Sequence, residues 1–94
     1  MKIDLGHIKD RHFREGRVAT ERLEPGGIGT GVWPLGTTDR GIKAAIRDAY
    51  KNMYFIKADG GGQYTIQGWS KAMGHIEMKV NFNELLIKSA YPIY

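Results

Sequence analysis

The second half of the chain alternates between apolar and polar residues, and this alternation limits the possible folds more than any other feature. Its clearest stretch is HIEMKVNF at 75–82, whose even-numbered residues are all apolar and whose odd-numbered residues are all polar. In a strand these two sets would lie on opposite faces. Similar stretches cover 53–58, 63–69 and 85–91. Because the links between them are short, we expect four strands that pair antiparallel.

Helical patterns precede these strands. Apolar residues recur at helical spacing between Ile42 and Met53, and Thr38 or Asp39 can cap a helix over about 39–52. A shorter helix is expected to begin at Leu5, with Asp4 as its cap. The sequence therefore predicts a single α+β domain over 1–94, in which two N-terminal helices pack on a four-stranded antiparallel sheet.

A glycine-rich segment lies between the two expected helices. Residues 15–37 hold six glycines and two prolines, which predicts a long loop, and long loops in small domains are usually functional. Thr30 stands between two glycines, whose backbone amides can approach a phosphate closely. Trp33 can stack on a nucleobase, although a tryptophan in so small a domain more often packs in the core.

Composition narrows the classes of function. Fourteen Lys and Arg against ten Asp and Glu give a net charge of +4, which suits a polyanionic partner and equally suits ordinary solubility. The absence of cysteine excludes disulfides, zinc-thiolate sites and cysteine nucleophiles. Three histidines without a close carboxylate pair make a poor metal site, so we expect neither a metal nor a cofactor. No apolar run approaches the ~18 residues of a membrane-spanning helix.

Two of the three histidines lie in one short segment, GHIKDRH at 6–12. His7 and Arg11 are four positions apart and would share a helix face, whereas His12 joins them only if the helix ends near it. Histidine can give or take a proton near neutral pH, and arginine matches the geometry of phosphate oxygens. The alternative is a polar helix surface with a histidine favoured by the helix dipole.

The last strand offers a second polar group. In KSAYPIY at 88–94, Ser89 and Tyr91 share one face of the strand, and Lys88 points the other way. Tyr91 can donate a hydrogen bond to phosphate or stack on a base, and Lys88 is a further candidate for substrate binding. The alternative is a partly buried aromatic residue beside a small polar one.

Three short motifs in this order resemble a known family. GHIKDRH at 6–12, GTGVWP at 29–34 and SAYPI at 89–93 resemble the C-terminal RNase toxin domains of bacterial polymorphic and contact-dependent growth-inhibition systems. Many of those domains belong to the barnase–EndoU–colicin–RelE group of folds. The lysine often found beside the loop threonine is absent here, and serine replaces the more usual threonine at position 89.

The resemblance implies a metal-independent endoribonuclease that cleaves tRNA or rRNA by attack of the 2′-hydroxyl. It implies delivery from a larger surface-exposed protein, action in the cytoplasm of a competing cell, and neutralisation by a cognate immunity protein. Its catalytic residues would be His7, Arg11, His12, Ser89 and Tyr91, with Thr30, Lys88 and Trp33 contacting the substrate.

Two other classes of function stay open on the sequence. A non-catalytic nucleic-acid-binding module would use the same basic surface and would bind RNA in a salt-sensitive way without cutting it. A protein-interaction domain would need an exposed apolar patch.

Overall fold

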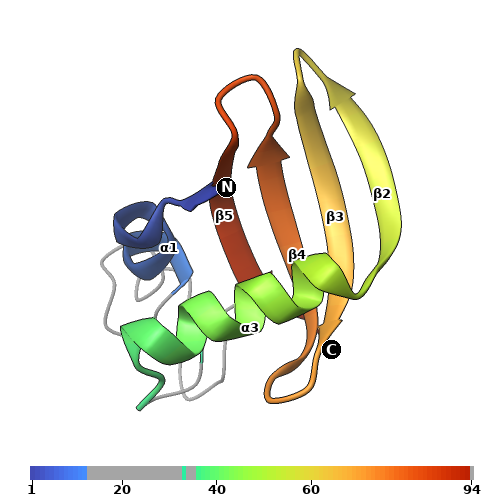
Figure 1. Cartoon of the computed structure of the whole chain (residues 1–94). Coiled ribbons are helices and arrows are strands. Elements are labelled where there is room, and N and C mark those ends of the chain that lie inside the picture. Colours follow the sequence, from blue (N-terminus) through green and yellow to red (C-terminus); the bar gives the residue numbers. More distant parts are fainter. Residues whose placement is uncertain (13–32, 34–35, 94) are drawn as a thin grey trace, which may run out of the picture.

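The computed structural model describes residues 1–12, 33 and 36–93 of the chain. Its elements are, in chain order, β1 (Lys2–Ile3), α1 (Leu5–His12), α3 (Asp39–Lys51), β2 (Met53–Gly60), β3 (Gln63–Ser70), β4 (Gly74–Asn81) and β5 (Leu86–Pro92) (Figure 1). The four long strands agree with the predicted ones to within two residues at either end. The α+β class is therefore confirmed.

The sheet has one strand more than the sequence predicts. Its order is β1-β5-β4-β3-β2, and β2 to β5 form the expected antiparallel meander. β1 adds to the outer edge of β5 in parallel, through hydrogen bonds from the Lys2 amide to the Leu85 carbonyl (3.1 Å) and from the Asp4 amide to the Ile87 carbonyl (2.9 Å). The prediction of a purely antiparallel sheet with four strands is therefore wrong. A two-residue strand is too short to show any alternation, so its sequence gives no signal.

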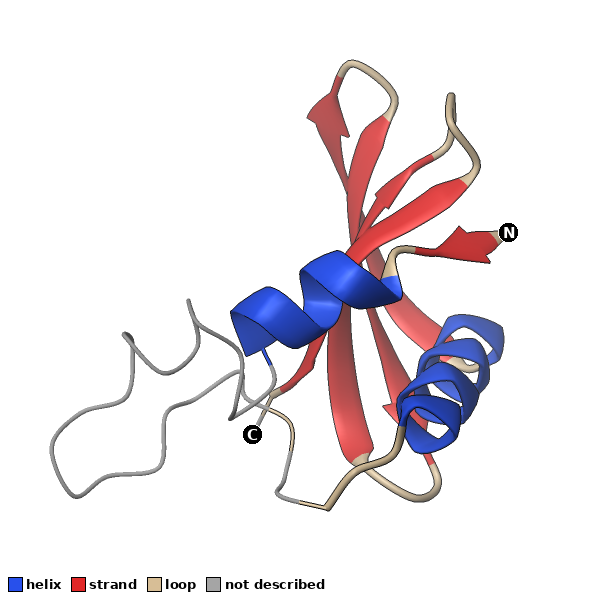
Figure 2. Ribbon diagram, turned by 90° about the vertical axis from the view of Figure 1, so that its left-hand side faces the viewer, coloured by secondary structure: helices blue, strands red, loops and turns tan. Residues whose placement is uncertain are grey.

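Helix α3 covers one face of the sheet. Its cap is Thr38, whose side-chain oxygen accepts a hydrogen bond from the Gly41 amide at 3.0 Å. The helix packs across β3 and β4, and Figure 2 shows it on one side of the sheet only. Its inward stripe is buried, as the helical spacing predicts, and consists of Ile42, Ala45, Ile46 and Ala49.

Helix α1 lies beside β5 rather than over the middle of the sheet (Figures 1 and 2). The carboxylate of Asp4 accepts a hydrogen bond from the His7 amide at 3.2 Å, so the predicted cap is confirmed. Ile8 is fully buried and joins the same core as the inward stripe of α3. The two helices thus share one core but contact different strands.

The core lies between the helices and the even-numbered residues of the central strands. Ile66, Ile76, Met78 and Val80 are at most 1% exposed, which confirms the face predicted from the alternation. Trp33 is also fully buried, and its indole N–H donates a hydrogen bond to the Ala90 carbonyl at 3.0 Å.

Gly68 allows α3 to lie almost against the backbone of β3. A Cβ atom placed on Gly68 would lie 1.8 Å from the carbonyl oxygen of Ala49. No side chain fits in that space, so the helix would have to move away from the sheet to accept one.

Gly68→Ala is therefore expected to destabilise the fold by roughly 1–3 kcal/mol, because α3 must shift and the core beneath it must open. Gly6→Ala is the matched control, since a Cβ there meets only the Asp4 carboxylate at 4.0 Å and favours the helix by up to about 1 kcal/mol. Denaturant midpoints of both variants give the measurement. A Gly68→Ala protein as stable as the native chain would contradict the close packing.

Candidate active site

The face of the sheet opposite α3 carries a line of three titratable side chains. His75, Glu77 and Lys79 are consecutive odd-numbered residues of β4, so they project from this face. We call them the β4 row. β4 is flanked by β3 and β5, so each member of the row can be contacted from neighbouring strands on both sides.

Glu77 is held from both sides. Its Oε1 accepts a hydrogen bond from Gln67 Nε2 at 3.0 Å, and its Oε2 accepts one from the hydroxyl of Tyr91. The strand register places Gln67 on β3 and Tyr91 on β5 directly opposite it. The carboxylate is partly buried and fixed in the middle of the face, where it can accept a proton from a bound group.

Lys79 is positioned by a chain of polar contacts that runs across the sheet. Its Nζ donates to the Thr65 hydroxyl at 2.8 Å, and that hydroxyl donates to Asp59 Oδ2 at 2.6 Å. Ser89, which is 7% exposed, lies opposite Lys79 on β5. An ammonium group beside a hydroxyl at this position is suited to an anionic ligand.

His75 is the exposed end of the row. Its Nδ1 is 2.7 Å from the Tyr54 hydroxyl, which leaves Nε2 as the ring nitrogen that can meet a ligand. The rings of Tyr54 and Trp69 both meet the imidazole edge-to-face, with centroids 5.5 Å and 4.9 Å away. The imidazole therefore has a fixed orientation.

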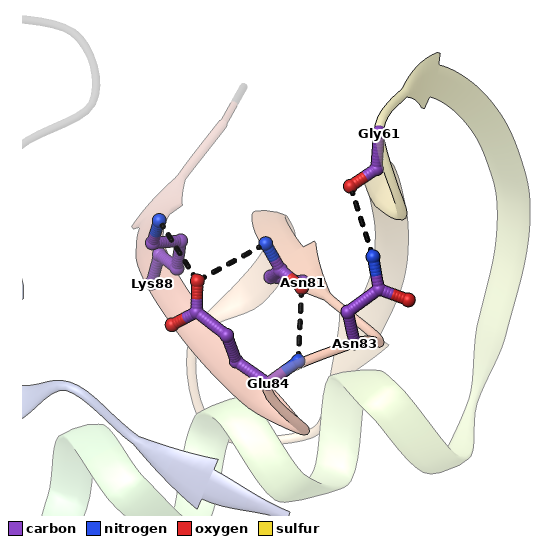
Figure 3. A network of polar contacts seen from close by, with 5 residues as sticks. All are labelled: Gly61, Asn81, Asn83, Glu84 and Lys88. Atoms are coloured by element: carbon purple, nitrogen blue, oxygen red, sulfur yellow. Dashed lines mark hydrogen bonds and ion pairs between the residues drawn. The ribbon is translucent and has the colours of Figure 1, made fainter.

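The predicted residues of the last strand fall into two groups. Ser89 and Tyr91 lie on the same face, as the period of two predicts, and face Lys79 and Glu77. Lys88 is the extra residue at a register shift, and its Nζ lies 3.7 Å from the Glu84 carboxylate. Figure 3 shows that carboxylate in the β4–β5 turn, where it also binds the Asn81 side chain. Lys88 is thus directed to the turn rather than to the β4 row.

The early motif lies on the element next to β5. His7 is partly buried. Lys9, about 200° round the helix from it, forms an ion pair of 2.9 Å with Asp39 at the start of α3. His7 therefore faces away from α3. Because α1 contacts β5, the segments that carry the first and last motifs lie side by side, although they are some 80 residues apart in the chain. The side chains of Arg11 and His12, and all of Thr30, lie outside the described residues.

The sequence allowed Trp33 either to stack on a nucleobase or to pack in the core, and in the structure it packs in the core. It has no exposed surface for a nucleobase, and its indole N–H is satisfied inside the core. Trp69, in contrast, is 48% exposed and stands beside His75.

The alternation in the sequence places the three members of the β4 row on one face of a strand. It does not identify them as a site. Their partners Gln67, Thr65 and Tyr91 come from other strands, and only the register of the sheet brings them together. Within residues 1–12, 33 and 36–93, no group of three or more metal-ligating His, Asp or Glu side chains comes together. In the same ranges no helix is long and apolar enough to cross a membrane.

Comparisons with known proteins give no match. No protein family matches the chain, and neither a curated protein nor a solved structure is significantly similar to it.

The two tryptophans are expected to behave differently in fluorescence. In Trp69→Phe the remaining emission comes from buried Trp33 and should resist quenching by acrylamide, whereas in Trp33→Phe the exposed Trp69 should be quenched readily. Trp33→Phe should also lower the stability by roughly 2 kcal/mol, since it leaves a cavity and an unpaired buried carbonyl. Equal quenching of both variants would contradict the burial of Trp33.

Proposed function

We propose that this chain is a metal-independent endoribonuclease toxin domain that cuts RNA by attack of a 2′-hydroxyl on the adjacent phosphate. The observation that carries the proposal is the β4 row, which holds a carboxylate, an imidazole and an ammonium group on one face within five residues. These are the groups that such a cleavage requires: a base, an acid and a cation for the phosphate.

The order of the row gives each group a role. Neighbouring members are about 7 Å apart along the strand, so a phosphate can lie between two of them. Glu77 takes the proton of the 2′-hydroxyl, whose oxygen then forms a bond to phosphorus. The bond from phosphorus to the 5′-oxygen breaks, and Nε2 of a protonated His75 gives its proton to that oxygen. The products are a 2′,3′-cyclic phosphate and a free 5′-hydroxyl, and Lys79, on the far side of Glu77, adds positive charge to the face that receives the RNA backbone.

The neighbouring strands position these groups. Tyr91 and Gln67 hold the two oxygens of Glu77, and Thr65 holds the Lys79 ammonium. Ser89 lies opposite Lys79 on β5 and borders the same end of the row. Tyr91 and Ser89 are therefore proposed as positioning residues beside Glu77 and Lys79, a different role for Tyr91 from the contact with phosphate or base expected from the sequence.

The early motif supplies further candidates on the β5 side. α1 contacts β5, whose residues Ser89 and Tyr91 border the β4 row. Arg11 and His12 are proposed to add cationic groups for the phosphate. His7 is the second candidate for proton transfer, on the element adjacent to the strand that carries Tyr91.

The biological setting follows from the motif resemblance and the charge. Delivery from a larger surface-exposed protein, cleavage of tRNA or rRNA in the cytoplasm of a competing cell, and neutralisation by an immunity protein are the expected properties of such a domain. The net charge of +4 suits both RNA and an acidic immunity protein.

Glu77→Gln and His75→Ala are each expected to slow RNA cleavage by about 10²–10⁴-fold, because each removes one proton-transfer group. The assay is incubation of total tRNA with purified protein in EDTA, with products separated on a gel. Glu84→Gln is the matched control, since Glu84 is an exposed carboxylate in the β4–β5 turn and should leave cleavage unchanged. Equal loss of activity in Glu84→Gln would contradict the roles given to the β4 row.

The same gel separates the enzyme from a binding module. Shifted but intact RNA with the native chain would favour a non-catalytic nucleic-acid-binding domain, for which the exposed Tyr54 and Trp69 would be the natural contacts.

His7→Ala tests the early motif separately. If His7 transfers a proton, the variant should lose both toxicity in bacterial cells and cleavage of tRNA, while its thermal midpoint stays within a few degrees of the native value. The cleavage rates of His7→Ala and His75→Ala are then compared. The variant with the greater loss of cleavage identifies the imidazole that transfers the proton. Full activity of His7→Ala would remove the early motif from the mechanism.

A further inference from the structure

Exposed aromatic rings gather at the His75 end of the β4 row. Tyr54 is 54% exposed and Trp69 is 48% exposed, and both rings contact the imidazole of His75. We call Tyr54, Trp69 and His75 the aromatic cluster. Large aromatic side chains stabilise a small domain when they are buried, so exposed ones next to polar catalytic groups need another explanation.

The aromatic cluster is built on a rigid base. Its three members come from β2, β3 and β4, and Trp69 lies directly opposite His75 in the register of the sheet. The Tyr54 hydroxyl and His75 Nδ1 are joined by a 2.7 Å hydrogen bond. The rings are therefore ordered before any ligand arrives, and a flat ligand would lose little free energy in ordering them.

Met53 and Phe55 beside Tyr54 are also exposed, but the charged groups around the cluster favour a nucleobase over an apolar protein surface. Glu77 is the next member of the row on the same face, and Lys79 follows it. An apolar partner that covered the rings would also remove these charged groups from water without pairing them, which is unfavourable. A nucleobase offers a flat face for stacking, and the phosphate attached to its sugar can lie against the charged part of the row.

We propose that the aromatic cluster binds the base of the nucleotide on the 3′ side of the cleaved bond. This inference rests on the proposed function. In that reaction His75 gives its proton to the 5′-oxygen of the leaving nucleotide, so the base of that nucleotide must lie on the His75 side of the phosphate, away from Glu77. The substrate class is then RNA that is unpaired at this position, because a base inside a duplex is already stacked on both sides.

The first experiment measures base binding without cleavage. A short 2′-O-methyl oligoribonucleotide lacks the attacking hydroxyl, and an abasic oligomer of the same length keeps the phosphates but lacks the bases. We expect the first to quench the fluorescence of exposed Trp69 and the second not to. Trp69→Leu should bind the base-bearing oligomer about tenfold more weakly and the abasic one equally well. Equal affinity of the native and Trp69→Leu chains for the base-bearing oligomer would overturn the proposal.

Ile56→Ala is the matched control. Ile56 is 53% exposed on β2 but lies opposite Ile66, on the face that α3 covers, so it should leave both affinities unchanged. Equal weakening by Ile56→Ala and Trp69→Leu would mean a general effect of lost apolar surface and would overturn the assignment to the aromatic cluster. Thermal midpoints close to the native value establish that both variants fold.

The second experiment tests whether the base bound by the aromatic cluster lies on the 3′ side of the cleaved phosphate. One substrate is a dinucleoside monophosphate, and the other is the methyl ester of the same 3′-nucleotide, whose leaving group has no base. Trp69→Leu should lower kcat/KM for the dinucleotide about tenfold more than kcat/KM for the methyl ester, which reports any effect of the lost ring on His75 itself. An equal decrease for both substrates would overturn the assignment to the leaving nucleotide. Base-dependent quenching by a native chain that cuts neither substrate would refute the proposed nuclease while keeping base binding, so the two failures are distinguishable.

Discussion

α3 can approach the sheet closely because β3 has no side chain at Gly68, where the carbonyl of Ala49 fills the space. This contact fixes the helix over the even-numbered residues of β3 and β4, and the buried core follows from it. The odd-numbered residues must then lie on the other face. Among the residues that the structure describes, α3 covers only the even-numbered face of β3 and β4, and the polar odd-numbered residues of β4 lie on the other face.

The position of β4 in the middle of the sheet explains why the site is ordered. A polar residue on an edge strand has neighbours on one side only, whereas Glu77 receives hydrogen bonds from both β3 and β5. His75 and Lys79 are likewise fixed by side chains from other strands. Side chains held in this way keep their geometry without a ligand, which the proton transfer of the proposed nuclease would require.

The sequence predicted the elements that have a period and missed those that depend on pairing. The alternation around Met78 and the helical spacing from Ile42 gave the strands, the long helix and the core face correctly. β1 was missed because two residues have no period, and the fifth strand exists only through its hydrogen bonds to β5. The candidate site was predicted in part: the face of Ser89 and Tyr91 was evident, but their meeting with Lys79 and Glu77 depends on register, which a single strand does not encode.

The two edges of the sheet differ, and the difference bears on how RNA would reach the site of the proposed nuclease. The β5 edge carries β1 and is flanked by α1, whereas every residue of β2 is exposed. If the proposed function holds, a flexible strand of RNA entering over β2 would meet Tyr54 first, then Trp69 on β3, and only then the charged residues of β4. Stacking would thus precede contact with the catalytic groups. A folded duplex presents its phosphates before its bases, so the same arrangement disfavours it. In the proposed nuclease, the exposed edge at β2 and the aromatic rings of Tyr54 and Trp69 would therefore favour the same kind of substrate.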